Sequence, residues 1–354
     1  MNSPAPFDRR RMAVILLLAA LVFLNTLAAP FQWDGIEFIA DNPIIHDLDN
    51  FLHPSKAAEY RWYGAFKNRY TGYLSFALNY SLHGSSPLGY HVFNITVHVM
   101  NSLLVFFMAL LLFRSPALKD TPLAERSSAI AMWAALIFAA HPVQTEAVTY
   151  IFQRHASLVA LFYLGSIVAY LMWRVGGRVW WYALALISAV VSMKTKENAF
   201  TLPLMILLIE YLFFSASSVS ERAGSPDAPV DVPPEALKEK SLLWLVPILL
   251  TMLVVPLSLV GLDRPPGEVM AGLGQRAGGY ASLEGGGREY LITQVRVVAT
   301  YLRLFILPLN QNLDYDYPSS GEAGVSSLLA AGFLHLLLWF SAGSILIKCR
   351  NTWF

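Results

Sequence analysis

Long apolar segments separated by short polar loops dominate the chain. Some reach or approach the roughly 18 apolar residues of a helix that can cross a bilayer, namely residues 12–29, 90–113, 157–173, 241–262 and 325–347. Shorter segments at 128–142, 179–193 and 199–214 fit if their polar ends lie at the membrane surface. The pattern predicts an all-α integral membrane protein, a multi-pass bundle of about eight or nine spanning helices within a single domain over residues 1–354.

Composition supports this prediction. Apolar residues make up 56% of the chain and charged residues only 14%, against roughly 25% charged residues in soluble proteins. A net charge of +1 gives no electrostatic argument for nucleic acid as a partner. The single cysteine, Cys349, excludes an internal disulfide, and we predict no metal site.

The basic residues predict an orientation. They fall in alternate loops, which the positive-inside rule places in the cytoplasm: residues 9–11, 114–126, 174–178 and the linker 215–240. The other side then receives a first outer loop at 30–89, short turns at 141–155 and 194–198, and a second outer loop at 263–324. Residues 12–29 could instead be a secretory signal, but the aromatic and acidic residues that follow favour a retained helix. A bacterial cytoplasmic membrane, with the functional site on the periplasmic face, is the expected location.

Amphipathic segments are expected on the outer face. Tyr73, Phe76, Ala77 and Tyr80 recur at helical spacing in the first outer loop, where residues 41–43 form a predicted turn. Residues 288–308 are read as an interfacial or re-entrant helix, since a ninth span there would place an acidic segment in the cytoplasm.

Candidate catalytic carboxylates follow the first helix. Asp34 and Glu37 are three residues apart near the predicted outer surface, where a carboxylate can act as general base toward a hydroxyl acceptor. Two solvated loop acids are the competing interpretation. His91, Asn94, His98 and Asn101 share one stripe of the second helix and either line a polar cavity or make interhelical hydrogen bonds.

Basic residues on the outer side indicate an anionic ligand. His141 and Glu146 lie near Arg154 and His155, and Lys196 and Glu197 lie in the next outer turn. Cations there run against the positive-inside rule, so a lipid phosphate competes with simple snorkelling as their explanation. Arg296 and Arg303, seven residues apart, share one helix face and could clamp a phosphate or anchor the helix to headgroups.

Several segments together resemble the membrane portion of the transmembrane and tetratricopeptide-repeat (TMTC) proteins and their bacterial relatives. They are 31–34 (FQWD), 41–43 (DNP), 74–80 (LSFALNY), 89–91 (GYH), 141–150 (HPVQTEAVTY), 153–154 (QR), 194–198 (KTKEN), 301–303 (YLR) and 310–317 (NQNLDYDY). The resemblance spans nearly the whole chain.

That family is similar to the protein O-mannosyltransferases and to the C superfamily of glycosyltransferases (GT-C), which use polyprenyl-phosphate sugar donors outside the cytoplasm. The resemblance implies a GT-C-like bundle that transfers a mannose-like sugar to a hydroxyl of a protein or glycan. Asp34 would be the catalytic base with Glu37 in support, and Arg154, Lys196, Arg296 and Arg303 would hold the donor phosphate. His91, Asn94, His98, His141, Glu146 and Glu197 would line the cavity. No cofactor beyond the donor substrate is expected.

Two features depart from the family pattern. The family usually shows two adjacent acids, whereas this chain has Asp34 followed by Gly35. No repeat of about 34 residues follows the helices, so the tetratricopeptide region is expected to be absent or supplied by a partner subunit. The alternative function is therefore a non-catalytic lipid-binding protein or a partner subunit of a membrane assembly.

Overall fold

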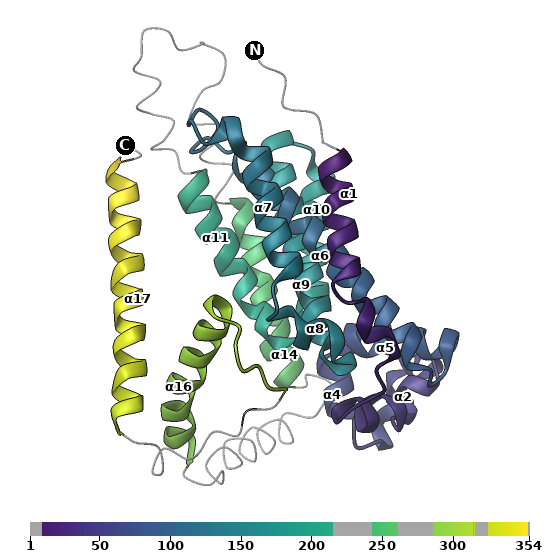
Figure 1. The fold of residues 1–354 in the computed structure, drawn as a ribbon. Coiled ribbons are helices and arrows are strands. Elements are labelled where there is room, and N and C mark those ends of the chain that lie inside the picture. Colours follow the sequence, from purple (N-terminus) through teal and green to yellow (C-terminus); the bar gives the residue numbers. More distant parts are fainter. Residues whose placement is uncertain (1–8, 215–242, 261–285, 314, 316–324, 353–354) are drawn as a thin grey trace. The chain divides into compact units, whose positions relative to one another are not determined.

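The computed structural model describes residues 9–214, 243–260, 286–313, 315 and 325–352. Regular structure in these residues is entirely helical (Figure 1). The chain divides into two compact units, Met1–Leu259 and Val260–Phe354, and each is described by itself. The predicted linker at 215–240 and much of the second outer loop lie outside the described residues.

The first unit is built on apolar helices, which the hydrophobic segments predicted. They are α1 (Arg9–Leu21), continued by the 3₁₀ helix η1 (Leu24–Ala28), α6 (Pro87–Leu112), α7 (Ser127–Ala140), α9 (Arg154–Gly176), α10 (Val179–Met193) and α11 (Leu202–Phe213). Residues 243–250, η7 (Thr251–Leu253) and α14 (Val254–Val260) continue the chain. Small residues such as Ala131, Ala135, Ala185 and Ala189 are fully buried at the helix contacts, because they allow close approach of helix backbones.

Four helical segments among the described residues are long and apolar enough to cross a membrane: Arg9–Ala28, Pro87–Leu112, Ile151–Gly176 and Ser326–Ile345. Val179–Met193 and Leu243–Ser258 are shorter apolar helices. A multi-pass membrane protein is therefore confirmed, whereas the predicted total of eight or nine spans stays a prediction.

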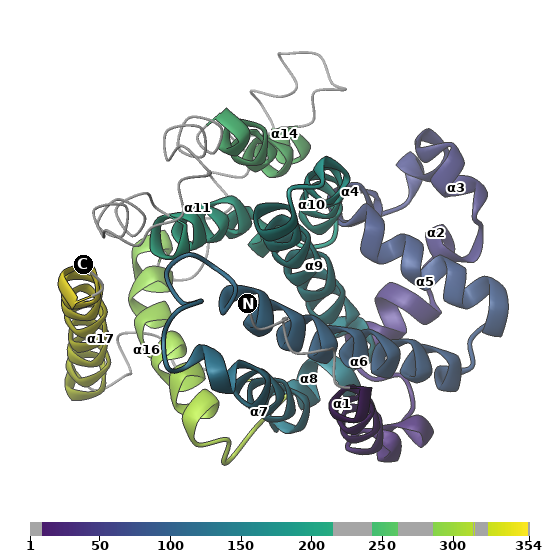
Figure 2. The same cartoon turned by 90° about the horizontal axis from the view of Figure 1, so that it is seen from above.

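The first unit has two distinct ends (Figures 1 and 2). At one end lie the start of α1, residues 113–126 and the α9–α10 turn, with the basic residues that the sequence placed together. The other, here called the α5 end, carries α5, α8 (Gln144–Thr149) and the connection from α10 to α11. The described loops predicted to be cytoplasmic thus lie at one end of the first unit, and the described segments predicted to be outer lie at the other.

Short helices form most of the predicted first outer loop. They are the π-helix η2 (Ile36–Ala40), α2 (Pro43–His46), α3 (Asp49–Leu52), η3 (Pro54–Glu59), α4 (Tyr63–Asn68) and α5 (Tyr70–His83). The predicted turn at 41–43 is the start of α2, where the Asn42 side chain accepts a hydrogen bond from the Ile44 N–H at 3.0 Å. The predicted helix at 73–80 is α5, whose Tyr73, Phe76 and Ala77 are buried against Ile44 and Phe66.

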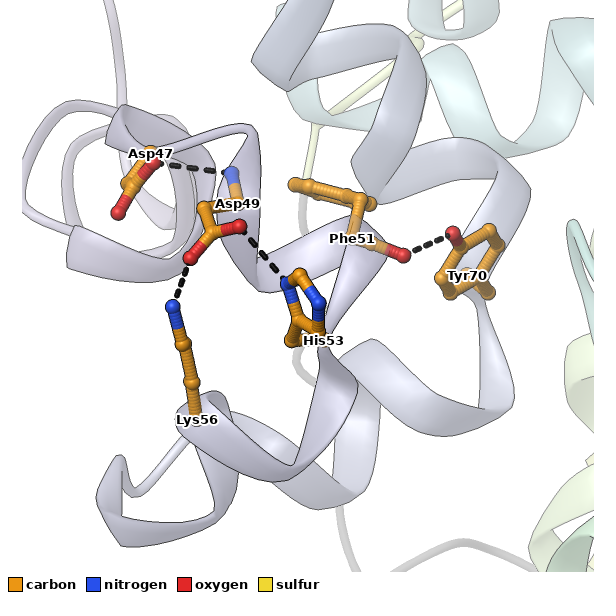
Figure 3. Close-up of polar contacts among 6 residues, drawn as sticks. All are labelled: Asp47, Asp49, Phe51, His53, Lys56 and Tyr70. Atoms are coloured by element: carbon orange, nitrogen blue, oxygen red, sulfur yellow. Dashed lines mark hydrogen bonds and ion pairs between the residues drawn. The ribbon is translucent and has the colours of Figure 1, made fainter.

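An exposed polar cluster caps α3 (Figure 3). Asp49 pairs with Lys56 and with His53 Nδ1, and these contacts lower the pKa of the Asp49 carboxyl, the Lys56 hydrogen bond contributing most. Tyr70 Oη donates to the Phe51 carbonyl at 2.8 Å and ties the start of α5 to α3. Because the ion pair faces solvent, it contributes little to stability.

The second unit contains α16 (Gly286–Ile306) and α17 (Val325–Thr352), which contact each other. α16 is amphipathic and is not among the described helices that could span a membrane. Its predicted interfacial or re-entrant placement stays a prediction.

Candidate functional site

Asp34 lies on an exposed turn at the α5 end. The residue before it, Trp33, has a left-handed backbone with φ of 48° and a side chain that is 66% exposed. The turn is closed by the Gly35 N–H, which donates to the Gln32 carbonyl at 2.8 Å. The Asp34 N–H donates to the hydroxyl of Tyr150, 116 residues later, at 3.0 Å.

Tyr150 lies near two carboxylates, those of Asp34 and Glu146. Burial raises the pKa of its hydroxyl to about 12, and the negative charges of Asp34 and Glu146 act in the same direction. The hydroxyl therefore stays protonated at neutral pH, near the negative charge of the Asp34 carboxylate. Tyr73 of α5 also lies within the electrostatic reach of Asp34, and burial raises its pKa to about 12.

Glu146 and Lys196 are two charged residues near Tyr150, and each affects the pKa of the other. Desolvation raises the pKa of the Glu146 carboxyl, and the nearby Lys196 opposes this shift. Lys196 Nζ lies 3.4 Å from Gln153 Oε1. Desolvation, followed by repulsion from Arg69, lowers the pKa of the Lys196 ammonium. Among the residues that the structure describes, no carboxylate forms an ion pair with the Lys196 ammonium, and a half-buried cation of this kind is suited to an anionic ligand.

Glu197 is held by Arg69 at the start of α5. Arg69 Nε donates to Glu197 Oε1 at 3.0 Å and Nη2 donates to Oε2 at 3.1 Å. Desolvation would raise the pKa of the Glu197 carboxyl, but the hydrogen bond and charge of Arg69 outweigh it and the pKa falls. The Thr71 N–H also donates to the Lys194 carbonyl at 3.0 Å. These contacts fix the turn that carries Lys196 onto α5.

The polar stripe of α6 makes interhelical hydrogen bonds. His91 Nε2 donates to the Ala29 carbonyl at 3.0 Å and His98 Nε2 to the Ala139 carbonyl at 3.0 Å. Asn94 and Asn101 donate to carbonyls at positions 148 and 157. All four side chains are buried, so the structure places His91, Asn94 and His98 between helices.

Arg154 is fully buried at the start of α9. Its Nε donates to Asn94 Oδ1 at 2.7 Å, and Nη1 and Nη2 donate to the carbonyls of Ser75 and Tyr90, each at 3.1 Å. The guanidinium also lies 4.3 Å from the Phe93 ring centroid. In this arrangement Arg154 joins α5, α6 and α9, and its three hydrogen bonds go to protein atoms.

Two other predicted residues point elsewhere. Glu37 Oε1 pairs with Arg61 Nη2 at 3.2 Å on the exposed surface of the first loop. His141 Nδ1 accepts from the Val143 N–H at 3.2 Å and shapes the turn between α7 and α8. Glu37 therefore pairs with Arg61, although it lies only three residues from Asp34.

The remaining predicted cations lie on α16 in the second unit. Arg303 Nη1 donates to the Leu309 carbonyl at 3.1 Å. Tyr315 Oη donates to the Asn310 carbonyl at 3.3 Å, and its ring lies 6.5 Å from that of Tyr301. The two family-like motifs of this unit thus pack together, with Arg296 two turns before Arg303 on the same helix.

Tyr150 and Arg69 were not among the predicted site residues. Tyr150 ends the family-like segment 141–150, which was the available signal, but its partner Asp34 is distant in sequence. Arg69 is one of the cations in a loop predicted to be outside, the same anomaly that drew attention to Lys196. Among the described residues, no group of three His, Cys, Asp or Glu side chains could hold a metal ion.

Known proteins were compared with the chain. No family model and no solved structure matches it. The protein O-mannosyl-transferase F38B6.6 of Caenorhabditis elegans is 30% identical over 164 residues, 45% of this chain and 22% of that protein. Protein O-mannosyl-transferase Tmtc1 of Drosophila melanogaster is 32% identical over 205 residues, 55% of this chain and 22% of that protein.

The human protein O-mannosyl-transferase TMTC4 is 34% identical over 140 residues, 36% of this chain and 18% of that protein. The chain thus spans at most 22% of the length of these three relatives. The resemblance indicated by the motifs is confirmed: this chain is similar to the TMTC protein O-mannosyl-transferases over about half of its own length.

Proposed function

We propose that the chain is a membrane glycosyltransferase that moves a mannose-like sugar from a polyprenyl-phosphate donor to a hydroxyl of a protein or glycan. Its similarity to proteins named protein O-mannosyl-transferases supports the reaction class. The observation that carries the proposal is the α5 end, where exposed Asp34 is bonded to the segment that also presents Glu146 beside Lys196. We place this end on the non-cytoplasmic side of a bacterial cytoplasmic membrane.

The chemistry requires a base and a phosphate-binding charge. The acceptor oxygen attacks the anomeric carbon of the donor, the bond from that carbon to the phosphate oxygen breaks, and the acceptor proton passes to Asp34. The polyprenyl phosphate leaves with its negative charge, which fixed cations stabilise. Lys196 is assigned this role in the first unit. Arg296 and Arg303 belong to the second unit, and their phosphate-binding role stays a prediction.

Other predicted residues take supporting roles. Arg154 is assigned to holding α5, α6 and α9 in place, because its donors already bond protein oxygens. Glu146 lies beside Lys196 and Tyr150 and sets their local charge. Glu197 positions the Lys196 turn through Arg69.

The test uses the full chain in proteoliposomes with radiolabelled polyprenyl-phosphate mannose and an extract of membrane and secreted proteins as acceptor. Asp34→Asn is expected to lower kcat by about a hundredfold or more, the usual contribution of a general base. Asp47→Asn is the matched control from the same loop and is expected to keep parental activity. Equal transfer by Asp34→Asn and the parent would overturn the proposal.

A second assay separates donor binding from base catalysis. Lys196→Met is expected to raise the donor KM about tenfold, the effect of losing one charge-assisted contact of about 1.4 kcal/mol. Unlabelled polyprenyl-phosphate glucose and polyprenyl-phosphate galactose are added as competitors. The degree to which each inhibits mannose transfer reports the sugar preference. An unchanged donor KM in Lys196→Met would remove Lys196 from the phosphate site.

The alternative is a lipid-binding or partner subunit without transfer activity. Gly35 favours it, since the resembled family usually carries a second acid there. Its signature would be saturable binding of polyprenyl-phosphate mannose by both the parent and Asp34→Asn, with no labelled product in either. Transfer that appears only when a repeat-containing partner is added would identify the chain as one subunit of the enzyme.

A further inference from the structure

The side chains of the turn that carries Asp34 are exposed and do little to hold it in place. Trp33 is mostly exposed although its backbone is left-handed, a conformation that costs a non-glycine residue about 1 kcal/mol. Asp34 itself is exposed. A carboxylate on such a turn samples many directions unless an outside contact fixes it.

Tyr150 supplies that contact in two directions. Its hydroxyl oxygen accepts the Asp34 N–H at 3.0 Å, which leaves the hydroxyl hydrogen free to donate to a carboxylate oxygen of Asp34. One hydroxyl therefore holds the backbone of the proposed base and can orient its side chain.

Tyr150 is itself firmly placed. Its N–H donates to the Glu146 carbonyl at 3.3 Å, and its carbonyl accepts from the Gln153 N–H at 3.0 Å. Arg154 follows directly after Gln153, and its buried guanidinium bonds α5 and α6. The hydroxyl thus extends from a junction of three helices toward the turn that carries Asp34.

We propose that Tyr150 is the positioning residue for Asp34, holding the carboxylate in the direction from which it takes the acceptor proton. The inference rests on the proposed transferase activity and goes further by naming a residue that acts through the base. Tyr150 need not touch the donor phosphate, because the assigned cations hold that group. Its loss should therefore affect the chemical step more than donor binding.

Tyr150→Phe keeps the ring and removes the hydroxyl that accepts the Asp34 N–H. We expect kcat to fall about tenfold or more, since small misplacements of a catalytic group are costly, with the donor KM within about twofold of the parent. Tyr163→Phe, which removes a hydroxyl bonded to Thr201 within the bundle, is the control and should match the parent.

A double-mutant cycle distinguishes this inference from the function on which it rests. In the Asp34→Asn background, Tyr150→Phe should cause little further loss, because the group it positions is already gone. Full activity in Asp34→Asn would sink the proposed function. A large loss in Asp34→Asn together with parental kcat in Tyr150→Phe would leave the function standing and overturn the positioning role. A donor KM that rises as much as kcat falls would also contradict it.

Discussion

Two glycines show how individual residues shape the site. A Cβ on Gly72 of α5 would lie 2.0 Å from His155 Nδ1, whereas a Cβ on Gly35 would meet only Phe31 at 3.5 Å. The His155 ring has no room to move, because it packs at 5.3 to 5.4 Å from the ring centroids of Tyr73, Phe76 and Phe152. Gly72 is therefore required by packing, although α5 would otherwise favour alanine.

Gly72→Ala should lower the free energy of unfolding by about 1 to 3 kcal/mol, the usual cost of overpacking a core. Gly35→Ala, in a helical conformation with ordinary contacts, should leave it unchanged or raise it by up to about 1 kcal/mol. Thermal unfolding of both variants in the same detergent measures the contrast. Equal midpoints for the two variants would show that His155 relaxes away from α5.

At the scale of elements, Arg154 links three helices at the α5 end. The guanidinium donates to Asn94 Oδ1, a buried acceptor, and also to the Ser75 carbonyl of α5 and the Tyr90 carbonyl of α6. At the opposite end, Arg174 and Tyr170 of α9 bond Glu210 of α11 at 2.7 to 3.0 Å. Buried polar side chains at both ends thus fix how α9 sits against its neighbours.

Arg154→Leu should destabilise the protein by about 1 to 3 kcal/mol, because Asn94 Oδ1 is left as a buried acceptor without its donor. Arg154→Lys should recover only part of the lost stability, since a single ammonium cannot reach all three acceptors that the guanidinium bonds. The measurements are the thermal midpoint and donor KM of each variant. A parental midpoint with a raised donor KM in Arg154→Lys would instead favour direct contact with the donor phosphate.

At the scale of the whole molecule, the first unit presents apolar side chains outward. Trp133 on α7 and Ile187 on α10 are 64% and 61% exposed, a pattern expected for helices that face lipid. The basic loops gather at the end opposite to α5. The positive-inside rule therefore predicts that the α5 end faces the non-cytoplasmic side.

Cysteine labelling in whole cells tests this orientation. In a Cys349→Ser background, Ser85→Cys in the turn after α5 should react with a membrane-impermeant maleimide in intact cells. Lys119→Cys, in the basic loop before α7, should react only after permeabilisation. The reverse pattern would place Asp34 in the cytoplasm, which contradicts the proposed use of a donor outside it.

The sequence by itself determined the all-helical membrane character, the helical segments and the likeness to the TMTC proteins. These properties depend on local hydrophobicity and on contiguous motifs, and both are visible in the amino-acid sequence. It also singled out Asp34 and Lys196, because an acid after a membrane helix and a cation on an unexpected side stand out without a structure.

Only the tertiary structure decided which side chains meet. Asp34 bonds Tyr150, Glu197 pairs with Arg69 128 residues away, and Glu37 turns to Arg61 instead of Asp34. The polar stripe of α6 and Arg154 were visible in the sequence, but most of their partners were not, because they are backbone carbonyls, which every residue carries. Contacts of this kind arise from helix packing, since segments distant in the chain become neighbours only once the bundle forms.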